Sequence, residues 1–454
     1  MRKRTIVWPA LALAATVPAL GGAAPLKVQP PQLAVRGHQL ANGLEILLHE
    51  DHSVPVVALQ VWYHVGSKDE RAGRSGFAHL FEHMMFKGSE NLAPGEITDY
   101  ILSIGGRYNA TTDFDRTLYF EIIPSNHLER LLWMEADRLR ALDVSEANFL
   151  SEREVVKEER RMRIDNPPFG RIFEVALANT FTTHPYKILS IGSMADLDEA
   201  TIEDVRAFHA MYYVPNNATV ILSGDFDPQQ ALAWIEKYFG PIPKSAEIHR
   251  NIPREPEQTA ERRVVDYDAN TPLPLAMLNF HVPAEGQPDM YALEVASRIL
   301  SDGQSSRLYR KLVYEQQIAL QAGGEAMTME DPGIFFFYAI LQQGHSIEEG
   351  EKSLVEEIER LQQQPVSAEE LDKARNQLVA GLVFNRQTVN DKATDIGHAG
   401  VILGDWHLVN QQIEKYQAVS AADVQAVARK YFRPENRTVV YMLPETMRPN
   451  EVKP

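Results

Sequence analysis

The chain has 454 residues, of which 44% are apolar and 24% charged, a composition typical of a globular protein with more than one domain. Its formal net charge of −17 repels phosphate backbones and anionic lipid headgroups, so nucleic acid is not an expected partner. The absence of cysteine excludes disulfides, thiol catalysis and Cys-ligated zinc, so a transition-metal site must be built from His, Asp and Glu.

The N-terminus has the pattern of a secretory signal peptide. Three basic residues at positions 2 to 4 precede an apolar stretch over 6–20, and small residues suited to cleavage follow, so we expect a signal peptide over 1–23. The stretch contains two prolines and is shorter than the ~20 apolar residues that span a bilayer. The sequence therefore predicts an exported, periplasmic protein without a membrane anchor. A buried first helix is the alternative interpretation.

Strand and helix patterns alternate in the first half of the chain. The succession of strands resembles hairpins and favours a largely antiparallel α+β domain, and the second half repeats this order. Apolar and β-branched runs indicate strands over 44–50, 56–65, 117–124 and 218–224. Apolar residues at helical spacing indicate helices over 77–88, 96–106, 128–142 and 146–163.

The helix expected over 77–88 carries three polar residues on one face. His79, Glu82 and His83 lie at i, i+3 and i+4, so they project from the same side of an otherwise apolar helix. Two imidazoles one turn apart can bind one Zn²⁺, and a glutamate beside them can take a proton from a metal-bound water. The order H-x-x-E-H is the inverzincin motif. Two histidines satisfied within an apolar core are the alternative.

The chain contains an internal repeat. Residues 201–223 match residues 420–442 without a gap, at an offset of 219, and both copies predict a capped helix, a Pro/Asn turn and a β-branched strand. The same offset carries the polar trio onto Arg298, Ser301 and Asp302, which cannot bind zinc in the same way. The trio is therefore specific to one copy, and the fold does not require it.

A segment rich in proline and charge separates the two copies. We expect a zinc-binding domain over 31–245, a linker over 246–262 and a homologous second domain without a metal site over 263–454.

Several motifs together resemble the pitrilysin/insulinase family of zinc peptidases. They are H-x-x-E-H, "GGRYNATTDFDRTLYF", "SEREVVKEERRM", "GDFDPQQALAWIEKYFG" and "SSRLYRKLV", and they cover nearly the whole mature chain. The resemblance is strongest to the short bacterial members that are similar to mitochondrial processing peptidase. It implies two homologous domains, each a mostly antiparallel sheet packed by helices, which together form half of a clamshell chamber that excludes folded proteins.

The resemblance also implies the third zinc ligand. Family members take it from a glutamate-rich helix about 75 residues beyond the second histidine. Aligning that helix selects Glu159 as the ligand, with Glu158 as the competitor, and a further family glutamate matches Glu152, which we expect to act with Glu82 in catalysis. The pattern alone, glutamates among Lys and Arg, is equally typical of a solvated helix face.

The segment "NATTDF" resembles the family's peptide-binding edge strand. An extended peptide adds to such a strand by main-chain hydrogen bonds, which gives affinity with little side-chain selectivity. The resemblance implies that Asn109, Ala110 and Thr111 bind substrate. An ordinary edge strand is the alternative.

These features predict a zinc metalloendopeptidase that hydrolyses unfolded peptides. One alternative is a non-catalytic structural or partner subunit of the same fold, because relatives of this fold include both. Another is a periplasmic metal-binding protein that uses the trio without chemistry, although Glu82 would have no purpose there.

The second copy departs from the family in one respect. Family members carry an Arg and a Tyr, seven residues apart, that reach from the second domain to hold the substrate, but the corresponding positions here are Val313 and Leu320. Arg307 and Tyr314 have the same spacing, although using them requires a six-residue slip. We therefore expect a heterodimer, in which a homologous partner subunit supplies the Arg/Tyr pair.

Overall fold

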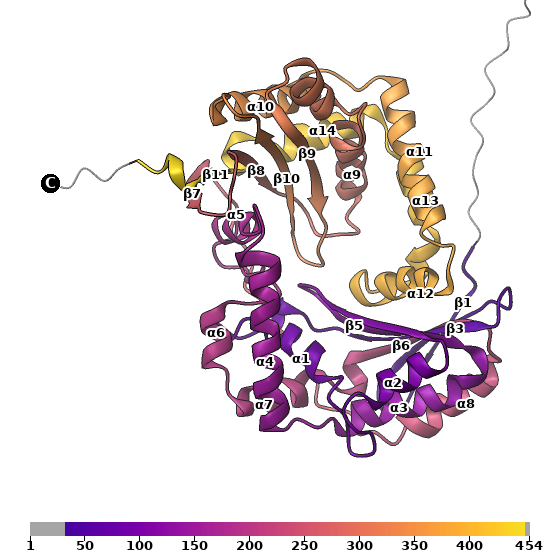
Figure 1. Cartoon of the computed structure of the whole chain (residues 1–454). Coiled ribbons are helices and arrows are strands. Elements are labelled where there is room, and N and C mark those ends of the chain that lie inside the picture. Colours follow the sequence, from indigo (N-terminus) through magenta and orange to yellow (C-terminus); the bar gives the residue numbers. More distant parts are fainter. Residues whose placement is uncertain (1–31, 450–454) are drawn as a thin grey trace, which may run out of the picture. The chain divides into compact units, whose positions relative to one another are not determined.

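The computed structural model describes residues 32–449, and two β-sheets with flanking helices follow one another along them (Figure 1). The signal peptide expected over 1–23 lies outside the described residues. From Leu33 onward the described chain belongs to one compact unit. Within that unit no helix has the length and apolarity needed to cross a bilayer.

The first sheet has six strands and ends at the strand that carries the expected peptide-binding residues. β2 and β6 are parallel, and the other neighbouring strands are antiparallel. β4 pairs with β5 on one side, and no other strand of residues 32–449 pairs with it. The order across the sheet is β1 (Val35–Gln39), β2 (Glu45–Glu50), β6 (Ala218–Gly224), β3 (Val56–Tyr63), β5 (Thr117–Pro124) and β4 (Arg107–Thr112).

The second sheet repeats this arrangement without a counterpart of β1. Its first two strands, β7 and β11, are parallel as β2 and β6 are, and the remaining pairs are antiparallel. The order is β7 (Arg262–Asp268), β11 (Arg437–Pro444), β8 (Leu275–His281), β10 (Ile334–Leu341) and β9 (Ala319–Met327). The α+β fold with two mostly antiparallel sheets is thus confirmed. The strands of the two sheets lie on either side of the expected linker, apart from Arg262, which begins β7.

The helices also recur in the two halves. The repeated helices α7 and α14 begin with the same capping box, Thr201 with Asp204 and Ser420 with Asp423. The first half contains α1 (Phe77–Met84), α2 (Glu96–Ser103), α3 (Leu128–Ala141), α4 (Glu146–Arg160), α5 (Ile172–Thr180), α6 (Met194–Glu199), α7 (Ile202–Tyr212) and α8 (Pro228–Phe239). The second half contains α9 (Pro288–Ser301), α10 (Ile347–Gln363), α11 (Ala368–Phe384), α12 (Val389–Gly397), α13 (Gln412–Ala418) and α14 (Ala421–Tyr431).

Most elements have the bounds expected from the sequence, and β5 and β6 match them at every residue. Two helices end earlier than expected, α1 at Met84 and α2 at Ser103. Gly105, with a φ of 78°, directly follows the C-cap residue Ile104 of α2, and a left-handed residue there ends a helix. Gly88, with a φ of 92°, lies four residues beyond the end of α1. The helix expected over 146–163 changes after residue 160 into a π-helical segment, Arg161–Asp165.

Each sheet buries its second face against a helix from the other half of the chain. α12 packs on the first sheet, where its Ala393 and Ile396 join one apolar cluster with Trp62, and Figure 1 shows it beside β5. α5 packs on the second sheet, where Val175 joins a cluster with Met277. Because both faces are covered, β3 and β8 are apolar along nearly their whole length.

The approach of α12 to the first sheet requires a glycine. A Cβ on Gly397 would lie 2.3 Å from Trp62 Cε2, whereas a Cβ on Gly381 of α11 would meet nothing within 4 Å. We predict that Gly397→Ala lowers the free energy of unfolding by about 1–3 kcal/mol through overpacking. Gly381→Ala is the matched control and raises it by about 0.5–1 kcal/mol, because alanine favours a helix interior. Denaturant unfolding of the two variants measures the difference, and equal shifts would contradict the close packing of α12.

Candidate metal centre

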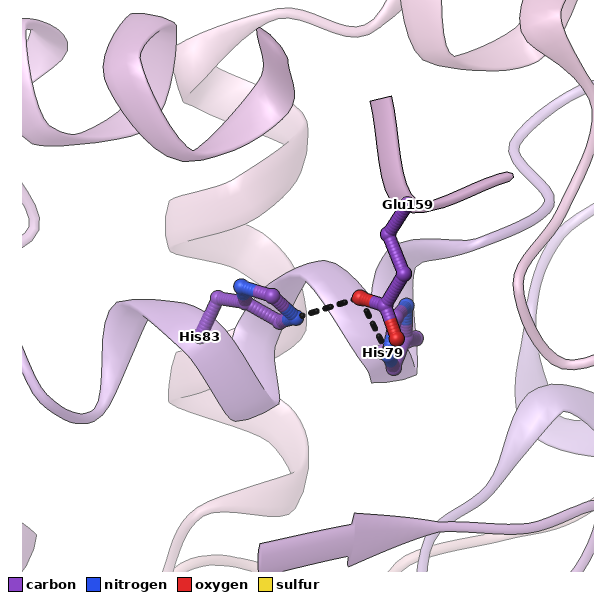
Figure 2. A group of neighbouring side chains, drawn as sticks. All are labelled: His79, His83 and Glu159. Atoms are coloured by element: carbon purple, nitrogen blue, oxygen red, sulfur yellow. Dashed lines mark ion pairs between the residues drawn. The ribbon is translucent and has the colours of Figure 1, made fainter. Parts of the chain in front are cut away.

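Two helices of the first half carry the three candidate ligands. α1 contributes His79 and His83, and α4 contributes Glu159 near its C-terminal end. The Glu159 carboxylate lies 3.6 Å from His79 Nε2 and 3.2 Å from His83 Nε2, and Figure 2 shows the three side chains converging. One ligand atom from each residue lies within 4.8 Å of the others. Elsewhere in residues 32–449 no group of three such side chains has this arrangement.

This donor set fits a zinc ion. Two imidazole nitrogens and one carboxylate oxygen make up a common set of protein ligands in catalytic zinc sites, which leave a fourth position open. Ligand atoms around one tetrahedral zinc lie about 3.3 Å apart, close to the two measured separations. Nδ1 of His79 is buried and forms no hydrogen bond with the described residues, whereas Nε2 faces the Glu159 carboxylate.

A close backbone contact fixes the spacing of the two ligand-bearing helices. Gly76, which begins α1 with a φ of 89°, lies against Gly192, where a Cβ would come within 2.5 Å of Gly76 Cα. From α4, Arg160 donates a hydrogen bond of 2.7 Å to the Gly192 carbonyl. Glu70 accepts from the Gly76 N–H at 2.9 Å and so caps α1. Larger residues at the two glycines would separate the helices and the ligands with them.

The two competing glutamates of α4 have different surroundings. Glu158 is exposed and pairs with Arg161 at 2.8 Å, as expected of a residue on a solvated helix face. Glu159 is largely buried and faces both histidines. The adjacent positions differ by about 100° around the helix, so only one of them can face α1.

Glu152 lies one two-turn step before Glu159 on the same face of α4. Its Oε2 atom is 3.5 Å from His83 Nδ1, and its Oε1 atom is 2.7 Å from Lys87 Nζ. Burial acts to raise the pKa of Glu152, but the hydrogen bonds from His83 and Lys87 outweigh it and lower that pKa. The contacts therefore place Glu152 behind His83, where an ionised carboxylate orients a metal-binding imidazole.

The pKa values of the two histidines are shifted in opposite directions. Burial, together with the charge of His83, lowers the pKa of His79 to about 4. Burial also acts to lower the pKa of His83, but the carboxylates of Glu152 and Glu159 outweigh it and raise that pKa to about 9. The hydrogen bond from His83 in turn lowers the pKa of Glu159. In the metal-free chain, His83 thus carries the proton that offsets the surrounding carboxylates.

Glu82, on the same helix as the two histidines, is held by a residue of the edge strand β4. The Thr112 hydroxyl donates a hydrogen bond of 2.6 Å to Glu82 Oε2. Burial raises the pKa of Glu82, and the hydrogen bond from Thr112 partly offsets that rise. A carboxylate with a raised pKa is suited to accepting a proton and passing it on near neutral pH.

A cleft with a volume of about 1000 Å³ surrounds these side chains. The expected substrate-binding residues Asn109, Ala110 and Thr111 lie on β4 and line it, so the unpaired edge of the first sheet borders the metal centre. The other lining residues include Phe86, Lys87, Pro94, Tyr108, Arg163, Ile164, Leu189 and Ile191.

Sequence reasoning did not identify Thr112, Lys87 or Arg163 as part of the site. Alternation along β4 provides a signal for Thr112, because Ala110 and Thr112 face α1 while Thr111 faces the opposite side. Lys87 lies just beyond the end of α1, and Arg163 lies in the π-helical segment and pairs with Glu159 at 3.0 Å. Helical spacing provides a signal for both, because Lys87 follows His83 by four residues and Arg163 follows Glu159 by four.

The corresponding place in the second half also contains a cavity. Arg298, Ser301 and Asp302, the residues at the repeat offset, line a cavity of about 250 Å³ between α9 and β9. Arg298 pairs with Asp302 at 3.3 Å. The duplication has thus kept the hollow beside the edge strand, while the residues there are not metal ligands.

The alternative Arg/Tyr pair of the second half lies outside the metal cleft. The Arg307 guanidinium is largely buried and pairs with Glu370 at 2.7 Å, and Tyr314 is 74% exposed. Neither residue lines the cleft, nor do Val313 and Leu320.

Two family profiles match the chain. One, described as "Insulinase (Peptidase family M16)", matches residues 45–191, which include the three candidate ligands. The other, described as "Peptidase M16 inactive domain", matches residues 199–378. Together they account for most of the described chain.

Named relatives agree with these profiles. The zinc protease PqqE of Helicobacter pylori is 32% identical over 414 residues, which cover 89% of this chain and 92% of the relative. The uncharacterized zinc protease YmxG of Bacillus subtilis is 24% identical over 398 residues, covering 88% and 96%.

Solved structures have the same fold. A protease from Helicobacter pylori superposes with a TM-score of 0.87 at 30% identity, covering 92% of this chain and 100% of that chain. The first half of the periplasmic protease PqqL from Escherichia coli gives a TM-score of 0.74 at 19% identity, covering 92% and 93%, and this likeness concerns the fold alone. Against complete PqqL, the match covers 48% of that chain. On the profiles, the identity to PqqE and the shared fold, the chain belongs to the insulinase family, peptidase family M16.

Proposed function

We propose that the chain is a zinc metalloendopeptidase that hydrolyses unfolded peptides. The observation that supports this most directly is the convergence of His79, His83 and Glu159 beside the free edge of β4, within one large cleft. A metal-storage site would need neither a third carboxylate such as Glu82 nor an adjoining strand edge.

In this proposal His79, His83 and Glu159 bind Zn²⁺. When bound, the metal lowers the pKa of a coordinated water and polarises a peptide carbonyl. Glu82 accepts the proton of the attacking water and delivers it to the leaving amine, while Thr112 holds the carboxylate in place. Glu152 keeps the His83 ring in the orientation that binds metal.

The proposed substrate mode is addition of an extended peptide to β4. Asn109, Ala110 and Thr111 lie on this strand, and alternate residues of it direct their main-chain groups to the unpaired edge. Pairing through these groups depends little on side chains. A folded protein cannot supply a free extended segment, so unfolded peptides are the expected substrates.

A non-catalytic partner subunit is the second candidate. The description of the second profile as an inactive domain favours it, but that match begins at residue 199, beyond the metal centre. The first half keeps a complete set of metal ligands and a candidate base, which supports catalysis.

We further propose that the chain is exported to the periplasm and acts there with a homologous partner. Neither Arg307 nor Tyr314 lines the metal cleft, so the chain lacks the family's substrate-holding pair at that site. The match to half of PqqL is consistent with a working unit of two such halves.

The assigned roles predict which substitutions remove metal and which remove only turnover. His83→Ala and Glu159→Gln lose bound zinc, because each removes one of three ligands. Glu82→Gln retains zinc and loses roughly 10²–10⁴-fold in peptide cleavage, because it removes the base. Glu158→Gln is the matched control and retains both. Zinc content by elemental analysis and cleavage of a quenched fluorescent peptide measure the two effects. Near wild-type cleavage by Glu82→Gln would refute the mechanism.

The pKa of His83 predicts a pH-dependent metal affinity. Because that pKa is raised to about 9, His83 is protonated below it, and zinc must displace the proton to reach the nitrogen. We expect the affinity for Zn²⁺ to rise about tenfold per pH unit between about pH 6 and pH 8, measured against a chelator of known pH dependence. Glu152→Gln removes one of the carboxylates that hold the proton and should weaken this dependence. An affinity that is constant across this range would contradict the assignment.

The partner proposal predicts a poor enzyme in isolation. Loss of donors beside the reacting carbonyl typically costs about 10²–10³ in rate, so the homologous subunit should restore about that factor at equal zinc occupancy. The test purifies the chain alone and together with a homologous subunit that carries the Arg/Tyr pair. Full activity of the isolated chain, abolished by Arg307→Ala or Tyr314→Phe, would exclude the heterodimer.

A further inference from the structure

Arg116 lies at the end of the edge strand that borders the metal cleft. It follows the turn between β4 and β5, and its Nη1 atom donates hydrogen bonds to the Thr111 carbonyl at 3.1 Å and to the Thr111 hydroxyl at 2.5 Å. Its guanidinium lies 5.1 Å from the centre of the Trp62 ring. These contacts fix the guanidinium beside the last residues of the free strand edge.

This arginine has no carboxylate partner, although the chain has an excess of acids. No carboxylate of residues 32–449 forms an ion pair with Arg116. Other arginines with largely buried side chains are paired: Arg138 with Glu135, Arg250 with Asp69, Arg307 with Glu370 and Arg386 with Asp395. Burial lowers the pKa of Arg116, which reflects the cost of holding an unpaired cation away from water.

Three carboxylates act on Arg116 without forming an ion pair with it: Asp113, Glu82 and Asp115. Asp113 lies on the same turn and accepts a hydrogen bond of 2.7 Å from the Phe114 N–H. Asp115 pairs with Lys68 at 2.9 Å and accepts a hydrogen bond from Tyr186 at 2.5 Å. Glu82 accepts a hydrogen bond from Thr112 at 2.6 Å. The remaining N–H groups of the guanidinium are therefore available to an anion from outside the chain.

The register of β4 and β5 determines which part of a bound peptide Arg116 can reach. Thr111 pairs with Leu118, and Leu118 belongs to the apolar cluster that packs on α12. Ala110 pairs with Tyr119, which belongs to the cluster on the side of α1. A peptide added to β4 would alternate in the same way, with every second side chain on the side of α1 and the others on the side of Arg116.

We propose that Arg116 is a specificity-determining residue that binds a carboxylate of the peptide substrate. This inference rests on the proposed peptidase function. The guanidinium offers planar, paired donors that match a carboxylate, and its attachment to Thr111 orients them before the substrate arrives. The carboxylate belongs to an Asp or Glu side chain on the Arg116 side of the bound peptide, or to the peptide C-terminus.

Peptide binding to the Glu82→Gln chain tests this without turnover. A fluorescent decapeptide without acidic residues and with an amidated C-terminus is compared with peptides that carry one Glu at successive positions, and with the free acid. We expect one placement of the carboxylate to lower Kd by about tenfold, as for a hydrogen bond between charged groups. A preference for a single Glu position identifies a side chain, and a preference for the free acid identifies the C-terminus.

Substitutions then assign the preference to Arg116. In the Glu82→Gln background, Arg116→Gln should abolish the difference between the preferred peptide and the neutral one, and Arg116→Lys should retain part of it. Arg107→Gln, at the exposed start of the same strand, is the matched control and should leave the difference unchanged. Zinc content and thermal unfolding of each variant show whether the fold and the metal centre are intact.

The outcomes separate this inference from the function on which it rests. If the Glu82→Gln chain binds peptides without preferring a carboxylate, or if the preference survives Arg116→Gln, the role of Arg116 is refuted while peptide binding stands. If the Glu82→Gln chain binds no peptide either alone or together with the homologous subunit, the proposed function fails, and the role of Arg116 fails with it.

Discussion

Each half of the chain covers the sheet of the other half with one helix: α12 packs on the first sheet and α5 on the second. The arrangement of the three candidate ligands depends on this exchange of helices. α4, which carries Glu152 and Glu159, continues through the π-helical segment toward α5, and α5 is buried on the second sheet. Arg160 ties α4 both to the Gly192 loop and to Glu174 of α5. The position of Glu159 relative to the histidines is therefore set from two sides: by α1 through the glycine contact, and by the second sheet through α5. The second half carries none of the three candidate ligands, yet it contributes to their geometry.

The candidate metal centre gathers charges of both signs. Three glutamates converge on two histidines, and Lys87 and Arg163 each pair with one of the glutamates. The pKa values of the two histidines move in opposite directions because Glu152 and Glu159 raise that of His83, whereas burial and the charge of His83 lower that of His79. Acids gathered around a buried imidazole would be costly in a purely structural cluster, and their cost is offset when a divalent cation binds. The same electrostatic reasoning singles out Arg116, whose positive charge has no partner within the described chain.

Local sequence patterns were sufficient to predict the helices and strands. They were insufficient to predict how these elements pack against one another. β5 and β6 have the bounds that β-branched runs predict, and the His79–Glu82–His83 face follows from helical spacing alone. The repeat also predicted two matching sheets. The exchange of α5 and α12 was not predictable, because an apolar helix face does not indicate which sheet it covers. The choice between Glu158 and Glu159 depends on which side of α4 faces α1. A role for Arg116 and Thr112 becomes recognisable only when β4 lies beside the candidate metal centre. All of these are contacts between elements that lie far apart in the sequence, and local sequence patterns do not predict such contacts.

Because of the exchange of helices, the two sheets differ in when their covering helix is synthesised. When the strands of the second sheet emerge, α5 already precedes them in the chain and can cover them at once. The first sheet is covered only later, because Ala58, Trp62 and Ile221 stay exposed until α12 has been synthesised. A nascent first half thus exposes an apolar sheet face next to an unpaired strand edge, a combination that promotes aggregation. Chaperones that delay folding until the C-terminal half is available would protect this intermediate.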